Sequence, residues 1–147
     1  MGLDDVSKQI VEQLQDDGRR SYAAIGKAVG LSEAAVRQRV QRLTDSGAVQ
    51  IVGVTDPMTL GFRRQAMVGL RCAGDLQEVA GQLAAMTEID YVVITAGAFD
   101  LLIEVVCADD DQLLEILSRV RSLPTVTTTE TFVYLKLCKQ TYTWGTR

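Results

Sequence analysis

The chain has 147 residues, of which 47% are hydrophobic and 23% charged, and its formal net charge is −4 at pH 7. This length allows one domain or two small ones, and the composition is that of a folded soluble protein. No run approaches the roughly 18 apolar residues of a membrane helix, and the start lacks the pattern of a secretion signal, so we expect a cytoplasmic protein. The chain has no histidine. The sequence therefore excludes Ser-His and Cys-His nucleophile pairs and His-ligated metal, and we expect no catalytic residue, metal or cofactor.

Charge and cysteine are unevenly placed. Residues 1–65 hold nine Lys and Arg against eight Asp and Glu, whereas residues 66–147 hold six against eleven, which indicates two functional halves. The three cysteines, Cys72, Cys107 and Cys138, are far apart, and each lies in or at the end of an apolar run. This spacing favours buried, reduced thiols over a disulfide frame or a zinc site.

The first half has the pattern of three short helices. Apolar residues recur at intervals of three and four over residues 4–15, 22–29 and 32–45. Ser21 and Ser32 are expected N-caps, while Gly30 and Gly47 are expected to end the second and third helices. Glycine inside a helix is unfavourable, so Gly26 indicates a point where two helices cross and pack closely. Three helices joined by tight turns predict a helix-turn-helix.

The segment that follows the helices indicates a domain boundary. Residues 48–56 form a strand-like run, which with the helices predicts a winged helix-turn-helix. Residues 57–65, PMTLGFRRQ, have the proline, glycine and charge content of a linker. We therefore expect a DNA-binding domain over 1–56, a linker over 57–65 and a second domain over 66–147.

The second half alternates between strand and helix patterns. Strands are expected over 66–72, 89–96 and 99–107, with a helix after the first strand and another from Asp109 to just before Pro124. The last strand is expected from the alternation of Thr131, Val133, Leu135 and Leu137 with Tyr134, Lys136 and Cys138. This order predicts an α+β fold, a ferredoxin-like βαββαβ plait. Met67, Leu102 and Val106 are candidates for an apolar sheet face that needs a partner subunit.

The segment from Leu31 to Leu43 concentrates basic and carboxamide groups. It holds three arginines, two glutamines and one acid. On a helix, Val36, Val40 and Leu43 share one side, and the opposite side carries Ala34, Arg37, Gln38, Gln41 and Arg42. Guanidinium groups suit guanine and phosphate, and carboxamides suit adenine, so this side fits a DNA major groove. The plainer interpretation is a solvated helix face, since Arg and Gln are good helix formers.

Several short motifs follow one another along the chain: the DGR of residues 17–19, the VGLS of residues 29–32, Arg39-Val40, Arg42-Leu43 and the AGAFDLLIEVVCAD that begins at Ala96. In the order and spacing of these motifs, the chain resembles the Lrp/AsnC family of transcriptional regulators over nearly its whole length. Two departures are Ser7, where the family usually has an acid, and Ala24-Ile25-Gly26, where it commonly has Glu-Leu-Ala. Both keep the apolar stripe of their helix.

The resemblance implies a sequence-specific regulator that binds double-stranded DNA and is controlled by a small effector, an amino acid. It implies homodimers that assemble into octamers, with no membrane partner. The expected DNA-binding residues are Ser32, Ala34, Arg37, Gln38, Gln41 and Arg42. The family's Gly-x-x-Asp turn matches Gly97 and Asp100, which would contact the effector, with Thr95 and Ala98 beside them.

Other interpretations remain open for both halves. Gly97 and Asp100 equally suit a plain hairpin turn. Glu104 and the run Asp109-Asp110-Asp111 could suggest a metal or paired-acid site, but a sheet-face charge and helix capping explain them better. Some haem-pathway decarboxylases resemble the same two-part fold, yet they use histidines, which this chain lacks. A ligand-binding module that does not bind DNA is the third alternative, and the Arg37, Gln38, Arg42 surface argues against it.

Overall fold

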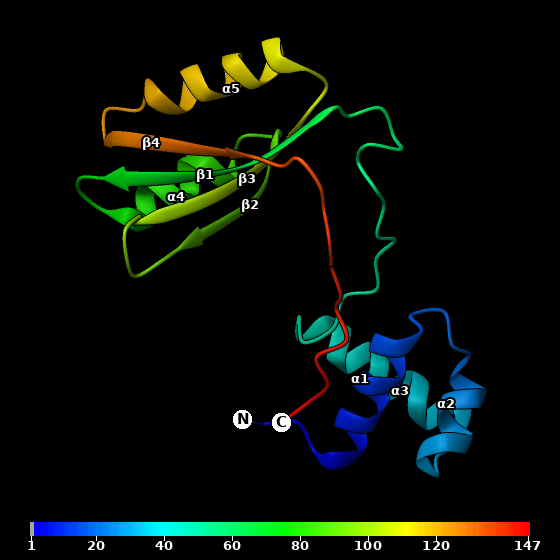
Figure 1. Cartoon of the computed structure of the whole chain (residues 1–147). Helices are drawn as coiled ribbons and strands as arrows, with labels where there is room; N and C mark the ends of the chain where they lie inside the picture. The colour runs from blue at the N-terminus through cyan, green and yellow to red at the C-terminus, as the bar shows by residue number, and fades with distance from the viewer. Residues whose placement is uncertain (1) are drawn as a thin grey trace. The chain divides into compact units, whose positions relative to one another are not determined.

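The fold was obtained as a computed structural model, which describes residues 2–147. The chain forms two compact units (Figure 1). The helical unit comprises the residues up to Val54 together with Cys138–Arg147, and the α/β unit comprises Thr55–Leu137. Cys138–Arg147 was expected to belong to the second domain, whereas it groups with the helices in the structure. None of the described helices is long and apolar enough to span a bilayer.

The helical unit contains the three expected helices, α1 (Asp5–Asp16), α2 (Tyr22–Val29) and α3 (Glu33–Asp45). Each helix begins at an oxygen-bearing side chain that accepts a hydrogen bond from a first-turn amide: Asp4 for α1, Ser21 for α2 and Ser32 for α3. Gly30 ends α2 in the left-handed conformation, with φ of 74°. The buried core of the unit consists of Ile10, Val11, Leu14, Ile25, Val36, Val40 and Leu43.

The turn between α2 and α3 depends on Gly26. Its carbonyl accepts the amide of Leu31 at 2.9 Å. A Cβ at position 26 would lie 2.5 Å from the carbonyl oxygen of Leu31, a backbone atom. The close packing expected at Gly26 is therefore present, although its partner is the turn before α3 rather than a helix that crosses α2.

Asp4 and Arg39 connect the start of α1 to α3. Arg39 Nη1 donates to both carboxylate oxygens of Asp4, at 3.0 and 2.7 Å, and to the hydroxyl of Ser7 at 3.0 Å. Asp4 also accepts the amide of Ser7 at 2.7 Å. The hydrogen bonds from Arg39 and from Ser7 hold the pKa of Asp4 well below its usual range. Ser7 therefore belongs to the contact that fixes α3 against α1.

The strand expected over residues 48–56 is not present, and the helix-turn-helix has no wing of paired strands. These residues have no regular secondary structure, and a turn follows at 57–61. Asp56 organises that turn by accepting the amide of Met58 at 3.0 Å and the hydroxyl of Thr59 at 2.9 Å. A strand requires a hydrogen-bonded neighbour, and the described part of the chain provides none for this run.

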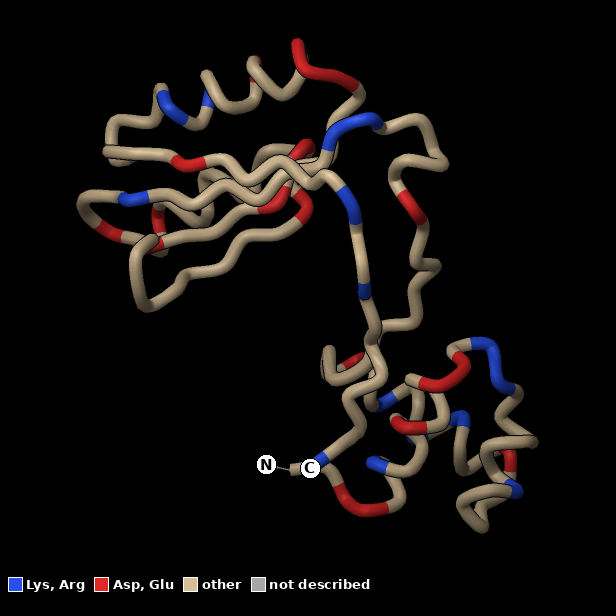
Figure 2. Tube along the Cα trace, viewed as in Figure 1, with Lys and Arg blue, Asp and Glu red and all other residues tan. Residues whose placement is uncertain are grey.

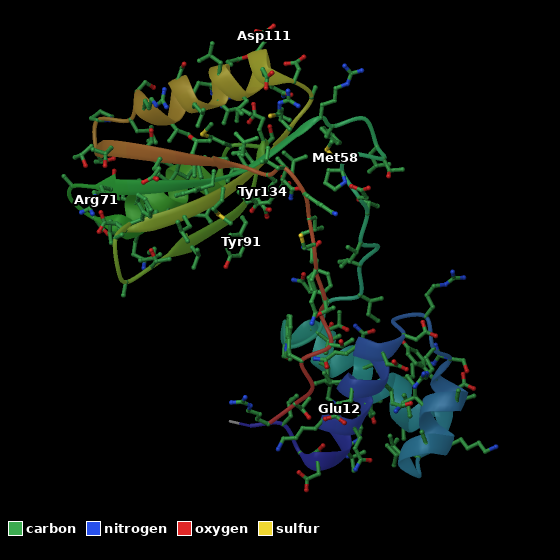
Figure 3. All side chains as sticks on the ribbon, viewed as in Figure 1. Glu12, Met58, Arg71, Tyr91, Asp111 and Tyr134 are labelled. Carbon is green, nitrogen blue, oxygen red and sulfur yellow. The ribbon has the colours of Figure 1, made fainter. Side chains whose placement is uncertain are left out.

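The C-terminal tail contacts α1 through polar pairs. The carboxamide of Gln15 accepts the amide of Gly145 at 3.0 Å and donates to the carbonyl of the same residue at 3.3 Å. Thr146 donates to Glu12 of α1 at 2.6 Å, and Figure 3 labels Glu12 on this helix. Tyr142 and Trp144 line one wall of a pocket of about 600 Å³ whose other wall includes Val11 and Leu14. The tail is therefore part of the helical unit.

The α/β unit is a four-stranded antiparallel sheet with two helices. In chain order its elements are β1 (Arg64–Cys72), α4 (Leu76–Ala84), β2 (Ile89–Ile94), β3 (Leu101–Cys107), α5 (Asp110–Arg121) and β4 (Val126–Val133). The strand order across the sheet is β2-β3-β1-β4 (Figure 1). Buried residues of the sheet, among them Val68 and Ile103, share one core with Val79 of α4 and Ile116 of α5. The predicted α+β plait is confirmed.

The last strand lies earlier in the chain than expected. Alternation placed it around 131–138, but β4 covers Val126–Val133, where it pairs with β1. Ala66 pairs with Val133, and the amide of Tyr134 donates to Gln65 at 2.8 Å. Leu135 and Leu137 lie beyond the end of the strand, and both are exposed. Threonines fill the first half of β4, so its apolar alternation is too weak to reveal it.

The sulfur groups only partly follow the expectation. Cys107 is buried, Cys72 is half-buried and Cys138 is exposed. Burial raises the pKa of the Cys72 and Cys107 thiols, and nearby carboxylates add to this effect. The prediction of a buried thiol is wrong for Cys138, because this residue follows the sheet rather than lying within it.

Asp109 caps α5 by accepting the amide of Gln112 at 2.9 Å, as the capping interpretation of the acidic run requires.

We predict that Gly26→Ala destabilises the helical unit by about 1–3 kcal/mol, because the added methyl group overlaps a backbone oxygen that cannot move independently. Gly81→Ala is the matched control, since a Cβ at this helical glycine meets no atom within 4 Å. It should stabilise the protein by about 0.5–1 kcal/mol. Urea unfolding followed by circular dichroism measures both changes. Equal stability of the two variants would contradict the role given to Gly26.

We also predict that the contact between Asp4 and Arg39 makes stability depend on pH. Folding lowers the pKa of Asp4 from its unfolded value of about 3.9. Its contribution is therefore fully present above that value and declines as the pH falls below it. The difference in urea midpoint between the parent and Asp4→Asn should be largest at neutral pH and should shrink in acid.

Asp5→Asn is the control for this measurement, since it changes the next residue of the same turn, whose side chain is 93% exposed. It should change the midpoint little at any pH. A difference between the parent and Asp4→Asn that stays constant from pH 7 to pH 2 would contradict the mechanism.

Candidate functional site

The face of α3 opposite the core is open to solvent. Val36, Val40 and Leu43 are buried, with exposed fractions of 0%, 3% and 5%. The residues expected to contact DNA are all exposed: Ser32, Ala34, Arg37, Gln38, Gln41 and Arg42. They lie on α3 and its N-cap, on the side that the spacing of the apolar residues predicted to face away from the core. A helix anchored on one side and exposed on the other is the arrangement that enters a major groove.

The three arginines of α3 have different surroundings. Arg39 is half-buried and is bound to Asp4 and Ser7. Arg37 donates to Glu33 at 2.8 Å, and its guanidinium carbon lies 5.2 Å from the centre of the Tyr22 ring. Arg42 makes a longer bond, 3.4 Å, to the carbonyl of Gln38. Arg37 and Arg42 therefore present exposed guanidinium groups, whereas Arg39 serves the packing of the unit.

The polar side chains of this face are held by local contacts. Gln41 donates to Asp45 at 2.8 Å, one helical turn along α3. Ser32 accepts the amide of Ala35 at 3.2 Å and so serves as the N-cap. Ala34 has no long side chain, which lets the first turn of the helix approach another surface closely. Acidic and basic residues are interspersed along the helical unit (Figure 2). The face is therefore a patterned surface rather than a uniformly basic one.

The turn between β2 and β3 holds the second group of expected residues. Gly97 has φ of 145°, and Gly97 and Ala98 are exposed. The hydroxyl of Thr95 donates to the carbonyl of Phe99 at 2.7 Å, and its amide donates to the carbonyl of Asp100 at 2.9 Å. These bonds close the turn and place all four expected residues at one end of the sheet.

Asp100 is bound to the neighbouring strand. One of its carboxylate oxygens, Oδ2, accepts the amide of Cys72 at 2.8 Å, and its own amide donates to the carbonyl of Leu70 at 2.9 Å. The carboxylate therefore stabilises the end of β1, a contact to another strand, whereas the hairpin interpretation had the aspartate stabilise its own turn. An Asp oxygen that accepts one amide keeps further acceptor capacity, so this bond is compatible with a ligand.

Phe99 also belongs to this turn and was not among the residues predicted from the sequence. Its ring lies over Gly69 of β1, where a Cβ would come within 2.6 Å of a ring atom. The ring also contacts Phe132 edge to face, with centroids 6.2 Å apart. The glycine within an apolar strand was the available signal, because such a glycine often marks the close approach of another group.

The sheet face away from the core carries a polar cluster beside its apolar groups. Met67, Leu102 and Val106 are half-buried on this face, as expected for the proposed partner surface. Glu104 accepts the carboxamide of Gln65 at 2.8 Å. Burial and the hydrogen bond to Glu104 raise the pKa of Tyr134 to about 12. Figure 3 labels Tyr134 just after β4.

Residues 2–147 hold no cluster of three or more His, Cys, Asp or Glu suited to a metal ion.

Comparisons with known proteins agree with this arrangement. Residues 3–44 match the model of the AsnC-type helix-turn-helix domain. Residues 62–147 match a C-terminal dimeric alpha+beta barrel domain of the AsnC transcriptional regulators. The HTH-type transcriptional regulator FL11 of Pyrococcus horikoshii is 33% identical over 141 residues, which cover 95% of this chain and 93% of that protein.

Two further relatives cover the same span. The proline dehydrogenase transcriptional activator of Rhizobium radiobacter is 32% identical over 145 residues, covering 95% of this chain and 93% of its own. The crystal structure of the leucine response regulatory protein of Mycobacterium tuberculosis superposes with a TM-score of 0.85 at 26% identity, covering 94% of this chain and 96% of that one. Fold, helix-turn-helix and relatives agree, and the chain belongs to the Lrp/AsnC family of transcriptional regulators.

Proposed function

We propose that this protein is a sequence-specific DNA-binding regulator whose activity a small effector, an amino acid, controls. The observation that carries the proposal is the exposed face of α3, where Arg37, Gln38 and Arg42 lie opposite buried Val36 and Val40. In a helix-turn-helix the second helix of the motif enters the major groove with its N-terminal residues toward the bases. The membership in a family of regulators supports this use of the face and gives no support to the decarboxylase alternative.

Each residue of the face has a role that follows from its chemistry. Arg37 and Gln38 lie in the first half of α3, where they would contact base edges, and Gln41 would extend this contact. Arg42 would bind phosphate. Ser32 and Ala34 would allow the helix N-terminus to approach the backbone of the DNA. In a dimer, two such helices read half-sites about one helical turn apart, and octamers are the larger assembly we propose.

We predict that Arg37→Ala and Gln38→Ala each reduce discrimination at a single base pair by about 1–3 kcal/mol, because they remove a contact to a base edge. Arg42→Ala should weaken binding to all sequences and reduce the salt dependence by about one phosphate contact. Fluorescence anisotropy on DNA selected by the parent protein, repeated at several salt concentrations, measures these effects.

Arg121→Ala is the control for these DNA measurements, because Arg121 lies on α5 of the other unit and donates to Thr129. It should bind DNA as the parent does. An unchanged base preference in the Arg37 and Gln38 variants, with unchanged affinity in the Arg42 variant, would contradict the assigned face.

The proposal places the effector at the turn between β2 and β3. Gly97, with its positive φ, can turn backbone amides toward a ligand carboxylate, and Asp100 can pair with a ligand ammonium group. Thr95 and Ala98 would form the sides of the site. One relative is named as an activator of proline dehydrogenase transcription, which supports an effector from amino-acid metabolism.

Asp100→Asn provides the test of this site, because an Asn oxygen can still accept the amide of Cys72 while the negative charge is lost. We expect one or more of the common amino acids to raise the melting temperature of the parent and to leave that of Asp100→Asn unchanged. Binding of DNA by the ligand-free variant should match the parent. Thermal shift across the panel of amino acids measures this, and an equal response of both proteins would contradict the assignment of Asp100.

A further inference from the structure

We propose that Glu33 and Tyr22 are positioning residues that orient Arg37 for reading a base, so that they determine specificity without touching DNA themselves. This inference rests on the proposed function, in which α3 reads DNA. The three arginines of α3 carry the same charge, but they differ in the side chains that surround them. Arg37 alone among them combines an exposed guanidinium with contacts from two different helices.

Two contacts hold the guanidinium of Arg37 from different directions. Glu33 Oε1 accepts from Arg37 Nη2 at 2.8 Å, at the edge of the planar group. The Tyr22 ring lies against the group, 5.2 Å from guanidinium carbon to ring centroid, within the distance of a cation–π contact. An edge contact and a ring contact together restrict the rotation of a side chain that otherwise has several torsional degrees of freedom. The plane of the guanidinium is thus partly fixed before DNA arrives.

Tyr22 is a firm support because its ring is anchored. It is the first residue of α2, directly after the N-cap Ser21, and it packs against the buried core of the helical unit. The packing of Tyr22 against the core therefore restricts the motion of its ring. Tyr22 also belongs to α2 whereas Arg37 belongs to α3, so their contact depends on the angle between the two helices of the motif.

Glu33 is placed at the helix position where a carboxylate is most favourable. It is the first residue of α3, and a negative charge there is stabilised by the partial positive charge of the helix N-terminus. It precedes Arg37 by four residues, the spacing and order that favour an ion pair along a helix. The two side chains remain 53% and 65% exposed, so the pair adds little to stability. Its effect is on orientation.

Arg42 and Arg39 provide internal contrasts. Arg39 is bound to Asp4 and Ser7 and is held within the unit. Arg42 donates a long bond, 3.4 Å, to a carbonyl of its own helix, which leaves its guanidinium adaptable. An adaptable cation suits phosphate, which needs charge more than direction, while a guanine needs two donors in one plane. The orientation of Arg37 therefore suits a base contact.

A carboxylate beside Arg37 also changes how the protein binds unrelated sequences. Glu33 opposes a phosphate that approaches Arg37, because like charges repel. Its removal should therefore strengthen binding to non-specific DNA while it lets Arg37 rotate and lose its preference for one base pair. Loss of the Tyr22 ring should lower the preference without this gain, because no charge changes.

The test compares full-length Glu33→Gln, Tyr22→Leu and Tyr22→Phe with the parent on DNA selected by the parent and on its single base-pair variants. At the base pair whose discrimination Arg37→Ala removes, Glu33→Gln and Tyr22→Leu should lose about fivefold or more of the preference. Tyr22→Phe keeps the ring and should retain it. Asp16→Asn is the charge control. Asp16 is the last residue of α1, and its carboxylate is paired with Arg20 in the turn that follows.

Each outcome decides between the alternatives. The proposal would be overturned if both Glu33→Gln and Tyr22→Leu kept the parent's full discrimination at that base pair. It would also be overturned if Glu33→Gln and Asp16→Asn gained the same affinity for every sequence while Glu33→Gln kept its base preference. Glu33 is an exposed side chain, so its variant tests the proposal even where Tyr22→Leu is poorly folded. If Arg37→Ala itself leaves every base preference unchanged, the proposed DNA-reading face fails, which is a different result.

Discussion

The close approach of Gly26 to the carbonyl of Leu31 is the constraint on which the helical unit depends. It lets the chain turn tightly after α2, with the amide of Leu31 bonded to the carbonyl of Gly26. The turn fixes the direction in which α3 starts, and this direction buries Val36 and Val40. The outward face of α3 is a consequence of that burial. The exposure of Arg37 and Arg42 therefore depends on the lack of a side chain at Gly26.

The helices were predictable because their signals are local. The predicted helix over 22–29 matches α2, and the N-caps Ser21 and Ser32 were named from the sequence. Helical hydrogen bonds join residues four apart, so apolar spacing, capping oxygens and glycine carry most of the necessary information. The exposure of the side of α3 opposite Val36 and Val40 followed from the same spacing. The order of elements in the α/β unit was predictable for a similar reason, since each strand and helix has its own period.

Features that depend on distant partners were not predictable. The run over 48–56 has strand-like residues but no strand to pair with, and β4 lies where β1 offers hydrogen bonds rather than where the apolar alternation is clearest. The contact of the tail with Gln15 joins residues 130 positions apart. In the candidate site, the spacing of Glu33 and Arg37 was visible in the sequence, whereas the contacts of Arg37 with Tyr22 and of Arg39 with Asp4 required the packing of the helices.

The distribution of charge takes on a different meaning once these contacts are known. The first 65 residues have nine basic and eight acidic groups, so the helical half has little net positive charge with which to attract DNA. Arg39 forms an ion pair with Asp4, and Arg37 forms one with Glu33. These pairs leave the positive electrostatic field around α3 weak. A weak field gives little non-specific affinity, because that affinity comes from the displacement of counterions by unpaired cations. Binding must then rely on the geometry of a few oriented groups. Under the proposed function, an acidic protein that carries three arginines on one helix and pairs two of them internally is suited to select among sequences more than to hold DNA in general.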